Sequence, residues 1–438
     1  MSPAIASILG LVVLFVLGTA LPINMGALAF ALAFLIGTFA VGMGASAILA
    51  GFPGDLFVTL VGITYLFAIA QKNGTIDLLV HWGVVAVGGR IAAIPWVMFG
   101  VAAVLTAIGA VSPAAVAIIA PIALRFARHY RIDPLMMGLL VIHGAQGGGF
   151  SPISIYGGIT NQIVERSGLP GNEMFLFLAS LIFNLVVAVG VFFAFGGARL
   201  IGQRDTGSHS DFEEGSGASL PVRGHGGTPA AANGHQAQKR ATRDQILTLA
   251  GLLILGVGSL VFGLNVGMVA ITIAVLLALF SPEAQKGAID KVSWSTVLLI
   301  AGVITYVGVL QQSGAIDGVS NGVAGLGAPL LAALLLCYIG GVVSAFASST
   351  GVLGAIIPLA VPFLAGGEIG AVGMIASLAI SATIVDVSPF STNGALVLAN
   401  APEGEREKLF RRFLIYSGLV VAAGPALAWA VLIVPNWM

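Results

Sequence analysis

The chain has 438 residues, of which 58% are hydrophobic and only 8% are charged. Soluble domains carry charge on about a quarter of their residues, so this composition excludes an ordinary soluble domain and indicates a polytopic membrane protein. Eighteen basic residues balance 18 acidic ones, which gives none of the basic excess expected of a protein with a nucleic-acid partner. The single cysteine, Cys337, excludes an intrachain disulfide and any cysteine-based metal site.

The first half of the chain predicts three membrane spans, an interfacial stretch, a hairpin and two further spans. A helix needs about twenty apolar residues to cross a bilayer, so the two short segments on either side of Gly109–Pro113 predict a re-entrant hairpin. The next span is predicted to break at Gly147–Pro152, because proline removes a backbone donor and clashes with the preceding turn. In order, the predicted elements are spans 4–20, 25–45 and 56–70, the interfacial stretch 76–89, the hairpin 94–126 with arms 94–108 and 114–126, the broken helix 134–162 and the last span 174–196.

Residues 198–245 contain hardly any apolar run and predict a flexible linker. Three of the six histidines lie in it, but His209, His225 and His235 are too widely spaced for a metal site. The second half then predicts the same order of elements. They are spans 246–263, 266–280 and 294–310, the hairpin 330–364 with arms 330–346 and 352–364, the broken helix 370–399 and the last span 413–434.

Two motifs recur at an offset of 237 residues, as in 388 minus 151. The pattern Ser-Pro-x-Ser-x-x-Gly begins at Ser151 and again at Ser388, and a serine followed nine residues later by proline begins at Ser112 and again at Ser349. The polar segment Gln71–Asp77 also resembles Gln311–Asp317, at an offset of 240. These matches predict two copies of one unit, residues 1–197 and 246–438.

The basic residues predict how the two copies face the membrane. Lys and Arg accumulate in cytoplasmic loops, and a cytoplasmic linker places 17 of the 18 basic residues on one side, with only Arg166 outside. An odd number of crossings in each copy then makes the copies inverted, with both termini outside. The predicted fold class is an all-α polytopic membrane protein of two inverted repeats, each with three spans, a re-entrant hairpin, a broken helix and a final span.

The hairpin tips and the helix breaks are predicted to form the binding site. Irregular backbone at membrane depth is tolerated only where it is buried in protein or lines a cavity, and its freed groups and half-helix ends bind ions and anions. The alternative is that the hydroxyls only bond back to the preceding turn, and their duplication favours the lining role. The candidate substrate-binding residues are Ser112, Ser151, Ser154, Gly157, Ser349, Thr350, Ser388, Ser391, Thr392 and Asn393.

Asp386 and His143 are ionisable residues inside apolar segments, and such residues are candidates for function. With Gln146 they are the candidates for ion coupling. For Asp386, proton coupling or cation balance stands beside a structural bond, whereas for His143 a neutral, hydrogen-bonded imidazole is the favoured interpretation. At the offset of 237 their counterparts are Gly149 and Ile380, so neither belongs to the repeated scaffold. The Gln146–Gly149 run lacks the lysine and glycine spacing of a phosphate-binding loop.

Three runs resemble the MatC-type malonate and dicarboxylate carriers, in the ion transporter superfamily that includes the divalent-anion/sodium symporters. They are YRIDPLMMGLLVIHGAQGGGFSPISIYGGI at 130–159, SAFASSTGVLGAIIPLAVPFL at 344–364 and DVSPFSTNGALVLANAPE at 386–403. The resemblance implies a homodimer of inverted repeats, in which two hairpins and two broken helices move like an elevator against a scaffold. It also implies a dicarboxylate bound between the hairpin tips, beside cation sites.

The hairpin tips differ from the Ser-Asn-Thr signature of the sodium symporters, since they read Ser112-Pro113-Ala114 and Ser349-Thr350-Gly351. This difference favours H⁺ over Na⁺ as the coupling ion, and it leaves a Na⁺ site near Ser349, Thr350, Ser391 and Asn393 as the alternative. No other cofactor and no metal centre is expected.

The sequence therefore predicts a multi-pass secondary carrier in the cytoplasmic membrane. Its expected substrates are small dicarboxylates, malonate first, with C4 acids and other small carboxylates as alternatives. A channel is a rival interpretation, as is an intramembrane enzyme, which lacks the support of an HExxH or GxSxG motif.

Overall fold

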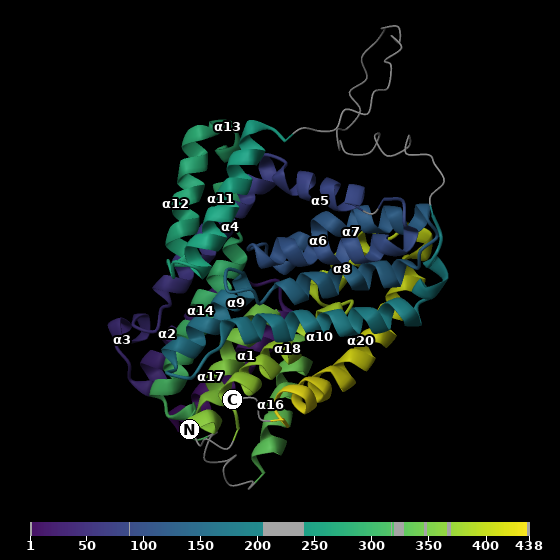
Figure 1. The fold of residues 1–438 in the computed structure, drawn as a ribbon. Coiled ribbons are helices and arrows are strands. Elements are labelled where there is room, and N and C mark those ends of the chain that lie inside the picture. The colour runs from purple at the N-terminus through teal and green to yellow at the C-terminus, as the bar shows by residue number, and fades with distance from the viewer. Residues whose placement is uncertain are drawn as a thin grey trace.

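A computed structural model describes residues 2–86, 88–204, 241–316, 318, 328–345, 348–365 and 369–435. Within these ranges the regular structure is helical (Figure 1). The α-helices are α1 (Pro3–Ala20), α2 (Met25–Ile36), α3 (Ala45–Leu49), α4 (Gly54–Lys72), α5 (Thr75–Ala86), α6 (Ile94–Ala107), α7 (Ser112–His129), α8 (Pro134–Gly148), α9 (Ile155–Arg166), α10 (Glu173–Ala194), α11 (Arg243–Leu260), α12 (Val266–Phe280), α13 (Pro282–Gln285), α14 (Trp294–Gln312), α16 (Pro329–Ser344), α17 (Ser349–Ala365), α18 (Ala371–Ile384), α19 (Thr392–Ala399) and α20 (Glu403–Leu432).

Seven helical segments of the described residues are long and apolar enough to cross a membrane. Two of them are the second broken helix, Ala371–Ala399, and the last helix from Gly404 to Leu432. The hairpin arms α6, α16 and α17 are shorter apolar helices. The all-helical, multi-pass membrane class predicted from the sequence is confirmed at this level.

Two of the elements that differ from their predicted bounds show why such differences arise. The span expected at 413–434 begins ten residues earlier, at Glu403, because the charged segment before it is also helical and carries an ion pair of 2.7 Å between Glu407 and Arg411 one turn apart. Hydropathy detects only the apolar part of such a helix. The span expected at 25–45 is α2 followed by a π-helical segment, Gly37–Val41, which ends where Gly42 takes a φ of 79°.

Some predicted features lie outside the described residues. They include positions 205–240 of the linker, with His209, His225 and His235, and the last residue of the repeated polar segment, Asp317.

The two halves of the chain pack against each other in a reciprocal way. Helix α2 of the first half packs on α14 of the second, and α12 of the second half packs on α4 of the first. Glycines allow both crossings, since a Cβ on Gly302 would lie 2.2 Å from the carbonyl oxygen of Gly26 and one on Gly62 would lie 2.6 Å from that of Gly267. Such small residues let helix backbones approach closely in membrane proteins.

The hairpins and the broken helices pack in the same reciprocal way. The second arm of the first hairpin, α7, contacts α19, and the second arm of the other hairpin, α17, contacts α9. Each hairpin also packs on the long part of the broken helix in its own half, α6 and α7 on α8 and α16 and α17 on α18. The hairpin tips are therefore placed against the helix breaks.

One end of the molecule, here called the linker end, contains Arg204 and Ala241, which flank residues 205–240. Backbone of Arg204 pairs with Arg90 there, and Asn73 donates a hydrogen bond of 2.7 Å to Thr248. Both chain termini lie toward the opposite, lower end in Figure 1. Arg166 forms an ion pair with Asp55, at the first turn of α4 and thus at the other end of that helix from Lys72.

Candidate functional site

The two helix breaks are built by the same hydrogen bonds. In the first break the Ser154 hydroxyl donates to the carbonyl oxygens of Gly149 and, over 2.6 Å, of Ser151, and it accepts from the N–H of Gly157 over 3.2 Å. These bonds cap the start of α9 and close the loop between α8 and α9. The Ser154 hydroxyl thus stabilises the backbone of the helix break, which is the structural role that the alternative interpretation gives to these hydroxyls.

The second break repeats this arrangement around Ser391. Its hydroxyl donates to the carbonyl oxygens of Asp386 and Ser388 over 2.6 and 2.7 Å, and it caps α19 by accepting from the N–H of Gly394 over 3.3 Å. The Ser388 hydroxyl accepts from the N–H of Phe390 over 3.2 Å. The repeated Ser-Pro-x-Ser-x-x-Gly motif is therefore a motif for a helix break.

The glycine that ends each motif is required by a close approach. A Cβ on Gly157 would lie 2.0 Å from the carbonyl oxygen of Ser151, and a Cβ on Gly394 would lie 2.0 Å from that of Ser388. No side chain fits at that distance. Gly157, predicted as a substrate-binding position, thus shapes the loop and brings its backbone close to Ser151.

The hairpin tip of each half meets the helix break of the other half. Ser112, the first residue of α7, accepts a hydrogen bond of 2.8 Å from the side-chain amide of Asn393. Tyr156 in the first break has the side chains of Thr350 and Ser112 as hydrogen-bond neighbours. Tips and breaks from both halves therefore form one cluster, and Tyr156 and Asn393 occupy equivalent places in it at the offset of 237.

Asp386 contributes a carboxylate to this cluster. The Ser349 hydroxyl, at the start of α17, donates to its Oδ1 over 2.5 Å, and Ser344 lies 2.8 Å from the same hydroxyl. Asp386 is only 7% exposed and lies within electrostatic range of Tyr156. Among the described residues it has no ion pair. A charge held here therefore depends on hydroxyl donors or on a bound cation.

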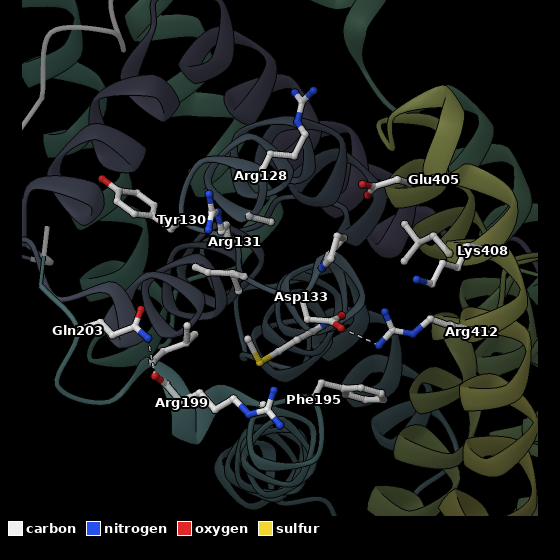
Figure 2. A pocket seen from close by; sticks show the side chains of 17 residues that line it. Arg128, Tyr130, Arg131, Asp133, Phe195, Arg199, Gln203, Glu405, Lys408 and Arg412 are labelled. Atoms are coloured by element: carbon white, nitrogen blue, oxygen red, sulfur yellow. Dashed lines mark hydrogen bonds and ion pairs between the residues drawn. The ribbon is translucent and has the colours of Figure 1, made fainter.

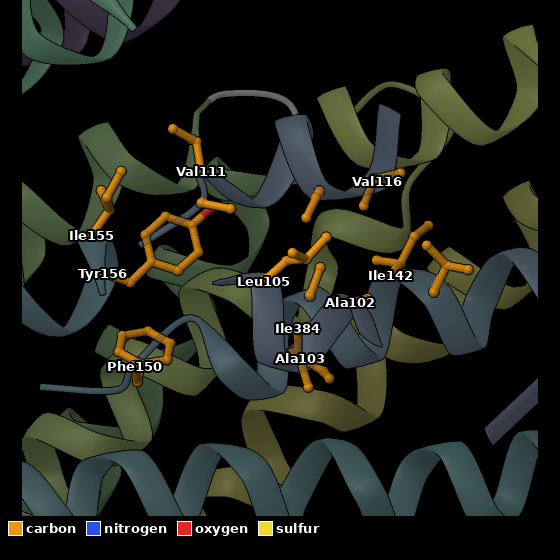
Figure 3. Close-up of a cluster of buried hydrophobic side chains, with 14 of the residues drawn as sticks. Ala102, Ala103, Leu105, Val111, Val116, Ile142, Phe150, Ile155, Tyr156 and Ile384 are labelled. Carbon is orange, nitrogen blue, oxygen red and sulfur yellow. The ribbon is translucent and has the colours of Figure 1, made fainter. Parts of the chain in front are cut away.

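The cluster is tightly closed. Ala110, Ser112, Gly149, Ile155 and Tyr156 surround a void that has no room for a water molecule. The Tyr156 ring packs on Phe150 with 5.5 Å between centroids, and Figure 3 shows the Tyr156 ring between Phe150 and Val111. In this conformation the void therefore has no room for a dicarboxylate.

The cluster offers groups for anions and for cations. Helices α7, α9, α17 and α19 all begin beside it, and the first N–H groups of a helix, with the positive end of its dipole, favour anions. The Asn393 Oδ1 is buried without a hydrogen-bond partner in the described part of the chain, and oxygens of this kind suit a cation or a donor. No lysine or arginine contributes to these contacts.

His143 lies in a different network. Its Nδ1 is 3.0 Å from Asn184 Oδ1 and its Nε2 is 2.8 Å from the Tyr416 hydroxyl. Because the Asn184 amide nitrogen already donates to the Ser180 carbonyl over 3.0 Å, Oδ1 is the acceptor and Nδ1 carries a proton. Nε2 can then accept from Tyr416. Both ring nitrogens are satisfied in the neutral imidazole, as the favoured interpretation predicts.

Two other predicted residues also lie apart from the cluster. Gln146 is fully buried next to His143, yet neither polar atom of its side chain has a hydrogen bond of normal geometry within the described residues. Thr392 is exposed, on the outer side of α19. The structure thus brings together Ser112, Ser349, Thr350, Asp386 and Asn393 of the predicted set.

Tyr156 was missed by sequence reasoning. The predicted site contains the small hydroxyl and amide residues of the motifs, whereas a tyrosine in an apolar run is typical of a packing residue. The offset of 237 contains the signal, because it pairs Tyr156 with Asn393, which was in the set.

The fold and the site define the class of this protein, a multi-pass membrane protein with a buried polar cluster between two hairpin tips and two broken helices. Residues 1–149 match the family described as the dicarboxylate carrier protein MatC N-terminus. This match supports the resemblance to the MatC-type dicarboxylate carriers that the sequence motifs indicate. No curated protein matches the chain.

Proposed function

We propose that this protein is a secondary active transporter of small dicarboxylates in the cytoplasmic membrane, with malonate as the first candidate substrate. C4-dicarboxylates and other small carboxylates, of the citrate or tartrate kind, are the alternatives. The observation that carries the proposal is the meeting of both hairpin tips and both helix breaks in one buried cluster. The family match of residues 1–149 supports the substrate class.

The cluster can hold a dicarboxylate without a basic side chain. Helices α7 and α17 begin at Ser112 and Ser349, one from each half. Each offers the positive end of its helix dipole, which favours an anion. We expect one carboxylate of the substrate at each of these two helix starts, with the hydroxyl of Thr350 and the amide of Asn393 as further donors.

Asp386 supplies the reason for coupling to a cation. Two like unit charges 4 Å apart repel by about 4 kcal/mol at an effective dielectric constant near 20. A dianionic substrate and an ionised Asp386 therefore cannot share the cluster unless a proton or a cation enters too. The first tip contains Pro113 and Ala114, which supply no side-chain oxygen, so we favour a proton. Na⁺ beside Ser349, Thr350, Ser391 and Asn393 remains the alternative ion.

We further propose that the two halves are inverted repeats and that transport follows an elevator-type motion in a homodimer. The reciprocal packing of α2 on α14 and α12 on α4 supports the repeats. The placement of Arg166 and Lys72 at opposite ends of α4 supports a linker end on the cytoplasmic side.

Uptake of labelled malonate into proteoliposomes tests this function. An H⁺ gradient and a Na⁺ gradient are imposed in separate experiments. We expect only the gradient of the coupling ion to drive saturable accumulation of malonate above the equilibrium level. Asp386→Asn should lose accumulation and keep exchange of malonate across the membrane. Flux that neither saturates nor exceeds equilibrium would indicate a channel. Chemical conversion of malonate would indicate an enzyme.

A further inference from the structure

A basic cavity of about 840 Å³ lies at the linker end, away from the polar cluster. It is formed where α7 ends and α8 begins, together with the end of α10 and the first turns of α20 (Figure 2). Its charged lining consists of Arg128, Arg131, Arg199, Lys408 and Arg412 with Asp133 and Glu405. Five cations against two carboxylates give the lining a net charge of +3, which attracts anions.

Arg412 is fixed in the wall of this cavity. It forms an ion pair of 2.8 Å with Asp133, the N-cap of α8, and its guanidinium lies 5.4 Å from the centre of the Phe195 ring. Of the five cations, it alone forms an ion pair within the described part of the chain. The other four can therefore meet an anion without breaking a pair.

The backbone at Arg131 adds a second observation. Arg131 has a φ of 53°, and it is the one non-glycine with a positive φ among the described residues. It follows the C-cap of α7, where Ile132 N–H bonds to the carbonyl of Ala127 over 2.8 Å, a place usually taken by glycine. A side chain costs about 1 kcal/mol there, and a residue held at such a cost is a candidate for function.

The cations do not belong to the repeated scaffold. At the offset of 237 none of the five has a basic counterpart in the other half. A general preference for basic residues on the cytoplasmic side explains their number. It does not explain why cations from three separate segments line one concave site.

The outer face of α20 connects the cavity to the lipid-facing surface. Lys408, Arg412, Ile415 and Leu419 follow at intervals of four, three and four residues, which places them along one side of the helix. Ile415 is 74% and Leu419 64% exposed, as expected of side chains that contact lipid. The cations at the start of this stripe and the apolar residues after it match a headgroup followed by acyl chains.

We propose that this cavity binds the phosphate of an anionic phospholipid headgroup, with the acyl chains along α20. Arg128, Arg131, Arg199 and Lys408 contact the phosphate and the other headgroup oxygens, while Arg412 shapes the wall. The ligand chemistry, a phosphate oxyanion, is shared by free inorganic phosphate. The stripe on α20 favours the lipid.

Native mass spectrometry of the full chain, released from nanodiscs of phosphatidylcholine and phosphatidylglycerol, tests the site. Wild type should retain phosphatidylglycerol in preference. The double variant Arg131→Gln with Arg199→Gln should bind it about thirtyfold more weakly, from the two headgroup contacts removed. Arg411→Gln is the matched control, since Arg411 is an exposed cation of α20 that does not line the cavity, and it should retain wild-type binding.

Arg131→Gly separates binding from folding, because glycine accepts the positive φ. We expect its thermal stability in detergent to equal or exceed that of wild type while phosphatidylglycerol binding falls. Equal retention of phosphatidylglycerol by wild type and both cavity variants would overturn the site. The lipid assignment is wrong if wild type shows no preference for phosphatidylglycerol and if, in phosphatidylcholine nanodiscs, inorganic phosphate stabilises wild type but neither cavity variant.

Discussion

Removing the Ser349 hydroxyl distinguishes the two coupling ions. In the structure this hydroxyl is 2.5 Å from Asp386 Oδ1, and it is the one side-chain donor to that carboxylate among the described residues. Hydrogen bonds to charged groups contribute about 1.5 to 3 kcal/mol. Ser349→Ala should therefore destabilise the ionised carboxylate by an amount that changes ion binding about tenfold to a hundredfold.

The direction of the change depends on the ion. If Na⁺ is coupled, it needs the ionised carboxylate, so the Na⁺ concentration for half-maximal uptake should rise about tenfold or more. If H⁺ is coupled, the loss of the donor favours proton binding, so the pH dependence of uptake should move to higher pH by about one to two units. The assay is initial uptake of malonate into proteoliposomes across a series of Na⁺ concentrations and a series of pH values.

Ser377→Ala is the matched control. Ser377 is fully buried on α18 and its hydroxyl lies 3.2 Å from the Cys337 sulfur, away from Asp386. It should leave both ion dependences unchanged. Ser349→Thr retains a hydroxyl and should lie closer to wild type than Ser349→Ala. A folded Ser349→Ala protein with unchanged Na⁺ and pH dependences would refute the assignment of Ser349 and Asp386 as a coupling pair.

Two further predictions concern stability. His143→Gln should lower the thermal midpoint, because the buried hydrogen bonds to Asn184 and Tyr416 are lost, and each group left unsatisfied costs about 1 to 3 kcal/mol. The pH profile of uptake should stay that of wild type. A shifted profile would place His143 in ion coupling. Gly302→Ala puts a Cβ 2.2 Å from the Gly26 carbonyl oxygen and should destabilise the protein by about 1 to 3 kcal/mol or more. Gly308→Ala on the same helix is the control and should be tolerated, because its nearest contact is at 3.4 Å. Equal midpoints of the two variants in a thermal shift assay would contradict the close crossing of α2 and α14.

Local structure was predictable where the sequence encodes it directly. The Ser-Pro-x-Ser-x-x-Gly motif indicates both breaks because serine caps a helix, and the glycine allows the close backbone approach seen at Gly157 and Gly394. Even so, the motif does not show what its second serine does. A capping hydroxyl and a ligand-binding hydroxyl have the same sequence signature, and only the contacts of Ser154 and Ser391 reveal the cap.

Tertiary pairing could not be predicted from the sequence in the same way. The hairpin at Ser112 and the break at Asn393 are 281 residues apart, and the offset of 237 relates equivalent positions rather than contacting ones. The repeat thus indicates which residues belong to the site, but not which hairpin tip contacts which helix break. Tyr156 was missed for a related reason, since its polar role comes from Thr350 and Ser112, which belong to distant segments.

The carboxylate of the site distinguishes the two halves at one pair of equivalent positions, Gly149 and Asp386. Ser154 and Ser391 donate to the carbonyl oxygens of Gly149 and Asp386, so the backbone of Asp386 belongs to the repeated scaffold and only its side chain is new. Size explains why the first half has no such side chain. A Cβ on Gly149 would lie 2.9 Å from the Tyr156 ring, whereas the equivalent neighbour of Asp386 is the smaller Asn393.

The small Gly149 beside the large Tyr156, and the larger Asp386 beside the smaller Asn393, lead to the last prediction. Gly149→Ala should destabilise the protein by about 1 to 3 kcal/mol, because the Tyr156 ring is buried against Phe150 and cannot yield. In the Tyr156→Asn background the same change should cost much less, so thermal midpoints of the four proteins should be non-additive. Gly158→Ala is the control, since its nearest contact is the Thr59 methyl at 3.9 Å. An equal loss in both backgrounds would show that the backbone at 149, rather than Tyr156, excludes a side chain, and the single charge of the site would then need another explanation.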